Sequence, residues 1–249
     1  MQAIDTYPGG QVPADLASAY AIQDDAIAAW PDTVAGWKVA AIQPLWREKY
    51  TAERLAGPVF LRSVWNAANQ AVDVPVIEGG YAAVEAEFAI RLSRTIDLSQ
   101  PLVDTQQLLS YVEGVYAAVE IAASPLASLS ALGPGAVVSD FGNNSGLVVG
   151  ASLPLSLLSD PASAVSEMEI NGEVAGRGDA SRIPGGPLAA LLFLVNHLAS
   201  RGRTLAAGDW ISTGASTGIH PVKPGDVVIA RFNQDVAMTI RIGRALAES

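Results

Sequence analysis

Cysteine is absent from the sequence, and histidine occurs only twice. The absence of cysteine excludes disulfide bonds, thiolate nucleophiles and zinc sites with cysteine ligands. Neither His197 nor His220 stands in a metal-ligand or catalytic-triad pattern, and the chain contains no H-E-x-x-H or Gly-x-Ser-x-Gly element. We therefore expect any bound metal to sit on oxygen or imidazole ligands.

Long apolar runs and basic clusters are also missing. No run approaches the roughly 18 to 20 residues that cross a bilayer, since the longest candidate, 188–198, carries Asn196 and His197. The first residues lack a basic region followed by an apolar stretch, so a cytoplasmic location is the default expectation. With a formal net charge of −10 and no Walker loop or dinucleotide fingerprint, the chain predicts neither nucleic acid nor membrane as a partner.

Hydrophobic residues make up 50% of the 249 residues and charged residues only 16%, which is more apolar than an average soluble domain. This excess favours burial of surface between subunits. We expect a homo-oligomer, or an assembly with a related enzyme of the same pathway, and a well-packed monomer is the alternative. An anionic substrate would need a bound divalent cation to invert the field of so acidic a chain.

Residues 1–57 predict a small helical arm or lid. Apolar residues at helical spacing favour a helix over 15–30, which Asp15 can cap and Pro31 would end. A short β-prone run, GWKVA, follows, and then the helix-compatible stretch PLWREKYTAERLAG.

Residues 58–249 predict a β-rich domain, because short β-prone runs alternate with Gly, Pro, Asn and Asp. GAVVSD, at 135–140, is one of these expected strands. Two helices are expected among them, one at 105–116 capped by Asp104 and one at 188–202 opened by Pro187. Without regular strand–helix alternation a doubly wound or TIM-barrel fold is disfavoured. The predicted class is α+β, with a folded-over mixed β-sheet.

Three glutamates stand in apolar strand-like runs. Glu85 and Glu87 are two residues apart, so in a strand both side chains point to one face. Glu120 is the only charged residue of its run. Buried carboxylates are costly unless paired or metal-bound, and three of them suit magnesium, manganese or calcium. A solvated edge strand, or a pair with a core lysine or arginine, is the alternative.

Lys38 lies among aromatic and aliphatic residues in GWKVA. Beside a metal such a lysine has a lowered pKa and moves protons, or holds a substrate carboxylate. A surface lysine whose stem lies along apolar neighbours is the alternative.

Two polar loops are further candidates. In SDFGNNSGLVVG, Asp140, Asn144 and Ser145 offer hydrogen bonds to a ligand, although such residues are equally common in ordinary turns. In STGASTG, Thr213 and its neighbours offer hydroxyls and backbone amides for a carboxylate.

The ordered set of segments resembles the 2-keto-4-pentenoate hydratase branch of the fumarylacetoacetate hydrolase superfamily; the segments are AYAIQDDAIAAW, GWKVA, VEAEFAIRL, VEIAASPL, SDFGNNSGLVVG, PLAALLFLVNHLASRGRTLAAGDWISTG and PVKPGDVVIARF. The resemblance implies a Mg²⁺ or Mn²⁺ site on Glu85, Glu87 and Glu120, and acid–base work by Lys38. It also implies catalytic roles for Asp140 and Ser145, which would position water. Substrate binding is expected at Asn144 and Thr213.

The implied reaction adds water to a 2-hydroxy-2,4-dienoate and gives a 4-hydroxy-2-oxo acid, a step of aromatic compound catabolism. The sequence departs from the family pattern E-I-x-D-S-R after Glu120, where it reads E-I-A-A-S-P. This departure leaves the substrate open. The alternatives are a metal-dependent 2-oxo-acid decarboxylase, an acylpyruvate C–C hydrolase and a non-catalytic partner subunit.

Overall fold

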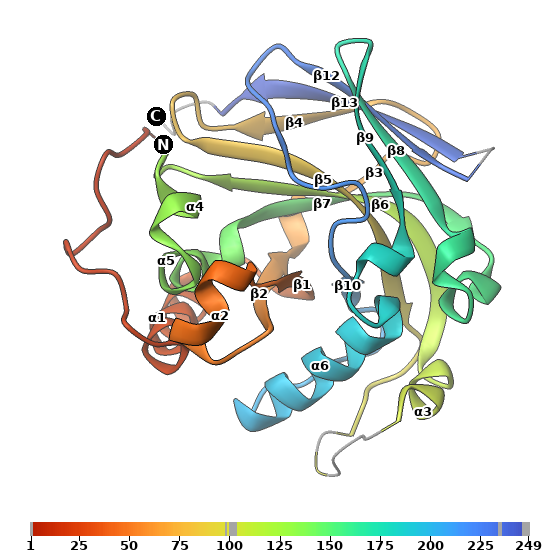
Figure 1. Ribbon diagram of the computed structural model, residues 1–249, viewed down its shortest axis with the longest axis horizontal. Helices are drawn as coiled ribbons and strands as arrows, with labels where there is room; N and C mark the ends of the chain where they lie inside the picture. The colour runs from red at the N-terminus through yellow and green to blue at the C-terminus, as the bar shows by residue number, and fades with distance from the viewer. Residues whose placement is uncertain (1, 98, 100–103, 234–235, 246–249) are drawn as a thin grey trace.

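The structure is a computed structural model that describes residues 2–97, 99, 104–233 and 236–245. Two β-sheets face each other, and most helices gather at one side of them (Figure 1). Within the described residues, the larger sheet has eight strands in the order β2-β1-β10-β5-β6-β7-β3, with β11 also paired to β5. In the same part of the chain the smaller sheet has five strands, in the order β4-β13-β12-β8-β9.

The strands are β1 (Val34–Ala41), β2 (Arg54–Phe60), β3 (Val64–Asn66), β4 (Val72–Val76), β5 (Tyr81–Leu92), β6 (Val112–Ser124), β7 (Asn144–Leu153), β8 (Val165–Ile170), β9 (Glu173–Asp179), β10 (Trp210–Ser212), β11 (His220–Pro221), β12 (Val227–Phe232) and β13 (Val236–Arg244). The α-helices are α1 (Leu16–Ala29), α2 (Pro44–Tyr50), α3 (Thr105–Leu109), α4 (Leu129–Leu132), α5 (Pro134–Ser139) and α6 (Gly186–Ser200). The 3₁₀ turns are η1 (Leu61–Ser63), η2 (Phe141–Asn143), η3 (Leu155–Leu158), η4 (Pro161–Ser163) and η5 (Ala180–Arg182). The predicted α+β class with a folded-over mixed sheet is confirmed.

The main core lies between the two sheets. Phe88 of β5 meets Phe232 of β12 edge to face, with ring centroids 5.4 Å apart, and Met168 and Met238 of the smaller sheet are buried in the same cluster. Burial of these side chains removes apolar surface from water and fixes which face of β5 points to the smaller sheet. The opposite face of β5 is thereby turned toward β1 and the helices.

The helices that were predicted to begin at Asp15 and Pro187 are present. Asp15 caps α1 by accepting from the backbone N–H of Ser18 (2.8 Å), and Pro187 lies in the first turn of α6. In the part of the chain that the structure describes, no helix has the length and apolar character of a membrane span.

Two predicted elements are wrong. The helix expected at 105–116 ends at Leu109, because the residues from Val112 onward pair as β6 with β5. The strand expected at 135–140 is the helix α5, which packs against α1 and α4. Short apolar runs carry too little periodicity to distinguish a strand from a helix. Here the secondary structure depends on the neighbouring elements, β5 for β6 and the helices α1 and α4 for α5.

The N-terminal segment contributes strands to the sheet that carries the glutamates. β1 pairs in parallel with β10 and antiparallel with β2, and the boundary expected between residues 57 and 58 falls inside β2. The division into an arm and a catalytic domain stays a prediction.

His197 of α6 is held neutral by its surroundings. Its ring stacks on Phe193 with centroids 5.3 Å apart and lies 4.4 Å from the ring of Tyr20, and Nε2 is 3.3 Å from Nη1 of Arg201. Burial, reinforced by the charge of Arg201 and opposed by Asp24, lowers the pKa of His197 to about 4.

This pKa predicts a pH-dependent stability. The unfolded chain protonates His197 near its ordinary value of 6.5, while the folded protein does so only near 4. The neutral ring therefore contributes its full stability above pH 6.5, and this contribution is lost as the pH falls from 6.5 toward 4. Between about pH 8 and about pH 5 we expect wild type to lose about 2 kcal/mol more free energy of unfolding than His197→Gln, measured with urea. Equal losses would show that His197 titrates normally in the fold.

Candidate metal centre

The alternation of β5 places Glu85 and Glu87 on the face opposite the core. Ala86 and Phe88 lie in the core between the sheets, so the residues at odd positions point the other way. On β6 the same rule applies, because Val119 is buried in that core and its neighbour Glu120 therefore shares the face of Glu85 and Glu87.

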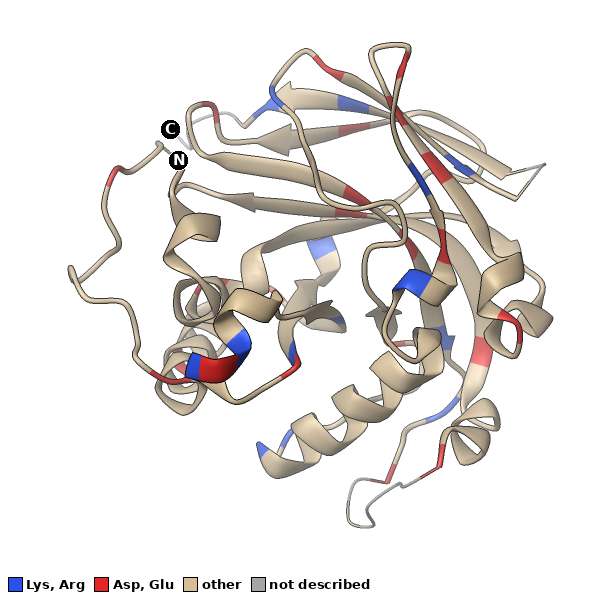
Figure 2. Ribbon diagram, in the orientation of Figure 1, with Lys and Arg blue, Asp and Glu red and all other residues tan. Residues whose placement is uncertain are grey.

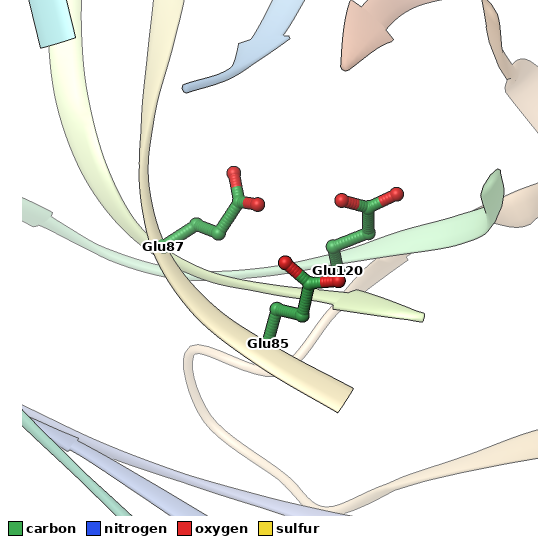
Figure 3. A group of neighbouring side chains, drawn as sticks. All are labelled: Glu85, Glu87 and Glu120. Carbon is green, nitrogen blue, oxygen red and sulfur yellow. The ribbon is translucent and has the colours of Figure 1, made fainter. Parts of the chain in front are cut away.

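The register of β5 and β6 brings the three glutamates together. Glu85 stands directly opposite Glu120, and Glu87 stands opposite Ala118, whose methyl group leaves room beside it. One carboxylate oxygen of each glutamate lies within 4.8 Å of the others. Figure 3 shows the three side chains pointing toward one another from the two strands. Glu87 and Glu120 are fully buried and Glu85 is 5% exposed, which removes the alternative of a solvated edge strand.

Glu87 has one oxygen held by the protein and one left free. Its Oε2 accepts hydrogen bonds from the hydroxyl of Ser212 and from the backbone N–H of Gly214 (2.8 Å). Its Oε1 is buried and has no hydrogen-bond partner among the described residues. Two fixed donors thus orient the carboxylate through Oε2, and Oε1 has no donor from the described residues.

Glu120 has the same division. Its Oε1 accepts from the side-chain amide of Asn144 (3.0 Å) and forms an ion pair with Nζ of Lys38 (3.2 Å). Its Oε2 is buried without a partner in the described part of the chain. Metal-binding side chains are commonly oriented in this way, by outer partners on the atom that does not bind the metal.

Burial and mutual repulsion make the cluster costly without a cation. Burial, then the charge of Glu120, raises the pKa of Glu85 to about 8, although Lys38 opposes the shift. The same causes raise the pKa of Glu87 well above its ordinary value, against the hydrogen bonds from Ser212 and Gly214. A divalent cation would offset both the cost of burial and the repulsion between the carboxylates, because it favours the ionised form of each one.

The spacing and chemistry of the cluster fit one divalent cation. Oxygen ligands lie about 2.0–2.1 Å from Mg²⁺ and about 2.3–2.6 Å from Ca²⁺, so two oxygens on one ion are at most roughly 4 to 5 Å apart. The three glutamate oxygens lie within 4.8 Å of one another, which is inside the limit for Ca²⁺. The buried cluster, with two oxygens that have no partner in the described part of the chain, is able to bind a divalent metal, as predicted from the sequence.

Lys38 reaches Glu120 because the sheet is curved. In the order β1-β10-β5-β6, a flat sheet would hold β1 and β6 roughly 14 Å apart, at about 4.8 Å per strand. Curvature brings Nζ of Lys38 to 3.2 Å from the carboxylate. Lys38 is 2% exposed, so the alternative of a surface lysine is wrong. Burial alone would lower its pKa, but the charges of Glu120, Glu85 and Glu87 outweigh it and raise the pKa of Lys38. The lowered pKa expected beside a bound metal stays a prediction.

A turn in an uncommon backbone conformation fixes Lys38 from the other side. Nζ donates to Oδ1 of Asn143 (3.1 Å), and Phe141, Gly142 and Asn143 all have positive φ, of 52°, 68° and 58°. Such angles are costly for a phenylalanine. A Cβ on Gly57 would collide with the backbone of Phe141. The absent side chain at Gly57 therefore lets the turn pack directly on β2 beside Lys38.

A cavity of about 230 Å³ opens onto this cluster. Glu85, Lys38, Asn143 and Thr213 line it, which gives a small molecule direct access to the buried carboxylate of Glu85 and to the ammonium group. Its size suits a short ligand, since it lies below the usual range for drug-sized molecules.

The remaining predicted site residues occupy different surroundings. Thr213 lines the cavity, but its hydroxyl donates to the carbonyl of Phe88 (2.6 Å). Asn144 binds Glu120. Asp140 and Ser145 do not line the cavity, and burial raises the pKa of Asp140 against a hydrogen bond from Ser124. The roles assigned to Asp140, Asn144, Ser145 and Thr213 stay predictions.

Sequence reasoning missed the contacts that orient the glutamates. The segment 212–218 was expected to offer hydroxyls and amides to a carboxylate, and in the structure that carboxylate is Glu87 of the protein itself. Asn143, which holds Lys38, lay in a loop already singled out. The polar residues of both loops are evident in the sequence, but no residue near them in the sequence shows that their partners are Glu87 and Lys38.

The chain is similar to a known protein family and to several known enzymes. The model of the fumarylacetoacetate (FAA) hydrolase C-terminal family matches residues 51–244. Over 151 residues the chain is 32% identical to 2-keto-4-pentenoate hydratase of Paraburkholderia xenovorans (strain LB400), covering 60% of this chain and 55% of that protein. Over 65 residues it is 42% identical to 4-oxalocrotonate decarboxylase of Pseudomonas sp. (strain CF600), covering 26% of this chain and 25% of that protein.

A solved structure shares the fold. The 4-oxalocrotonate decarboxylase from Pseudomonas putida G7, complexed with magnesium and adipate, superposes with a TM-score of 0.78 at 23% identity, covering 97% of this chain and 91% of that one. The aligned part spans about half the length of the curated hydratase. With the family match over most of its length, this chain belongs to the fumarylacetoacetate hydrolase family.

Proposed function

We propose that this chain is a divalent-metal-dependent hydro-lyase that adds water to a 2-hydroxy-2,4-dienoate and releases a 4-hydroxy-2-oxo acid. One observation carries the proposal: the buried Glu87 and Glu120 each have an oxygen without a hydrogen-bond partner among the described residues, close to Glu85, which lines a cavity with Lys38. The similarity to a 2-keto-4-pentenoate hydratase over more than half of the chain supports the choice of reaction.

Glu85, Glu87 and Glu120 would hold Mg²⁺ or Mn²⁺. When bound, such an ion supplies Lewis-acid polarisation to the carboxylate and 2-oxo oxygens of a substrate. Ser212 and Gly214 hold one oxygen of the Glu87 carboxylate and would keep this ligand fixed when an ion binds.

Lys38 is the proposed proton donor and carboxylate ligand. Its ammonium group has three donors; Glu120 and Asn143 accept two contacts, and the side chain lines the cavity, where the third donor can serve a substrate. The ammonium group would donate a proton to the terminal carbon of the dienol while the 2-hydroxyl group loses its proton, so that the net change is tautomerisation to a 2-oxo-alkenoate. Water then adds its hydroxyl to C4 and its proton to C3 of the resulting 2-oxo-alkenoate.

A 2-oxo-acid decarboxylase is the second candidate. The 42% identity to a 4-oxalocrotonate decarboxylase over 65 residues favours it. Both reactions proceed through an enolate of the 2-oxo acid, and they differ in whether water is added or a second carboxylate is lost as CO₂.

Metal binding is tested with Glu87→Gln. The change keeps the shape of the side chain but removes the charge, so we expect Mn²⁺ affinity to fall by about tenfold or more, since even outer partners of metal ligands contribute that much. Isothermal titration calorimetry measures it. Glu113→Gln is the matched control, because Glu113 lies on β6 but is exposed and pairs with Arg91. Equal affinities in the two variants would remove Glu87 from the metal site.

The reaction is tested by the decay of the ultraviolet absorbance of freshly generated 2-hydroxypenta-2,4-dienoate with Mg²⁺ or Mn²⁺. We expect metal-dependent decay to 4-hydroxy-2-oxopentanoate, absent in Glu87→Gln and retained in Glu113→Gln. Release of CO₂ from 4-oxalocrotonate, with no decay of the dienoate, would select the decarboxylase instead.

Lys38→Met tests the proposed proton transfer. Methionine keeps most of the side-chain length without the ammonium group, and loss of a general acid lowers kcat by about a hundredfold or more. We expect that loss in steady-state turnover while Mn²⁺ binding remains measurable by calorimetry. Unchanged kcat would contradict the role.

A further inference from the structure

A single glutamine of α1 joins three segments that are distant in the sequence. Gln23 is fully buried. Its Nε2 donates to the carbonyl of Ala56 (3.1 Å) on β2 and to the carbonyl of Val138 (2.7 Å) on α5. Its Oε1 accepts from Nη2 of Arg201 (3.0 Å), the residue that follows α6. Breaking any of these bonds would leave a buried polar group unpaired, which costs free energy, so Gln23 holds the three segments in a fixed relation.

Ala56 needs these partners because β2 is the last strand at one end of the larger sheet in the described part of the chain. Backbone groups on the outer edge of such a strand have no neighbouring strand. The N–H of Ala56 donates to the hydroxyl of Tyr20 (2.9 Å), and its carbonyl accepts from Gln23. Side chains of α1 therefore bind both backbone polar groups of this residue, and Figure 1 shows α1 next to α5.

Lys38 lies against both β2 and the turn of residues 141–143. Gly57 stands opposite Lys38 in the register of β1 and β2. A Cβ added to Gly142 would lie 3.4 Å from Cδ of Lys38 and 3.1 Å from Cα of Gly57, and Asn143 accepts from the ammonium group. A small shift of the turn relative to β2 would thus change the packing of the lysine stem and the contact of its ammonium group together.

Gln23 binds one carbonyl on each side of the contact between β2 and the turn. Ala56 directly precedes Gly57, and Val138 lies in the last turn of α5, which leads into residues 141–143. The side chain of Gln23 therefore sets the distance between β2 and the segment that carries the turn.

We propose that Gln23 is a positioning residue, which keeps the ammonium group of Lys38 at Glu120 by fixing the spacing between β2 and the turn. Its effect on turnover rests on the proposed function, in which Lys38 donates the proton. Gln23 is not among the described residues that line the cavity, so it acts through Lys38 and does not touch a ligand there. Tyr20 supports the same spacing, because it binds the N–H of Ala56.

The position of the ammonium group is tested by NMR. The chain has three lysines, Lys38, Lys49 and Lys223, and Figure 2 shows the basic residues spread over the fold. Lys49 and Lys223 are exposed, so only the buried ammonium group of Lys38 should exchange its protons slowly enough to give a ¹H–¹⁵N signal. Lys38→Met assigns this signal by removing it. We expect Gln23→Leu, which is similar in volume but has no hydrogen bonds, to broaden or abolish the signal in a protein that circular dichroism shows to be folded.

Turnover gives a second readout. Misplacing a catalytic group by about 1 Å can lower a rate by about a hundredfold. We expect Gln23→Leu to lower kcat for 2-hydroxypenta-2,4-dienoate by about tenfold or more, with Mn²⁺ binding still measurable by calorimetry. In a Lys38→Met background the same change should have no further effect, because a residue that acts through Lys38 has nothing left to position. Tyr20→Phe removes one hydrogen bond from Ala56 and should change the signal and kcat in the same direction, by less.

Asp24→Asn is the matched control. Asp24 follows Gln23 on α1 and pairs with Arg201 and Arg203, so its loss also affects stability, but its hydrogen bonds among the described residues do not reach β2 or α5. This variant should keep both the Lys38 signal and kcat.

Three results overturn the inference: no slowly exchanging signal in wild type, an unchanged signal in Gln23→Leu, or an equal loss of kcat with and without Lys38. Where Gln23→Leu does not fold, an unchanged signal in Tyr20→Phe overturns it. A wild-type protein that leaves the dienoate intact rejects the proposed function, whereas loss of the Lys38 signal in Gln23→Leu with retention in Asp24→Asn still sustains the positioning role.

Discussion

Three carboxylates buried on one face of a sheet are the constraint around which this protein is arranged. Isolated ions in a protein interior are costly, and an unpaired one is destabilising by several kcal/mol. Lys38, Ser212, Asn144 and the amide of Gly214 satisfy one oxygen each of Glu87 and Glu120. The other two oxygens remain without partners in the described chain. The protein thus neutralises part of the charge and leaves a defined remainder for a cation.

The second sheet makes this arrangement possible. Phe88 packs on Phe232 across the core, and the alternation of β5 then directs Glu85 and Glu87 away from that core. Curvature of the larger sheet brings β1 close enough for Lys38 to reach β6. Packing between the two sheets therefore determines which face of β5 carries Glu85 and Glu87, and the curvature of the larger sheet determines whether Lys38 reaches them.

Charge is distributed so that an acidic protein can accept an acidic ligand. The net charge of −10 would oppose an anion approaching from solvent. The wall of the cavity carries Lys38, Arg54 and Arg182 together with Glu85. The homo-oligomer expected from the apolar composition stays a prediction, and it would add subunit surface to this picture.

The sequence by itself determined the features that depend on neighbours along the chain. A two-residue spacing in a strand puts Glu85 and Glu87 on one face, an aspartate cap begins α1, and the absence of cysteine restricts metal ligands to oxygen and imidazole. The tertiary structure decided the rest. The pairing of Glu85 with Glu120, the reach of Lys38, the donors on Glu87 and the helical state of α5 all depend on segments distant in sequence. Periodicity and capping are local interactions, whereas register and curvature are set by packing between strands, which no short stretch of sequence encodes.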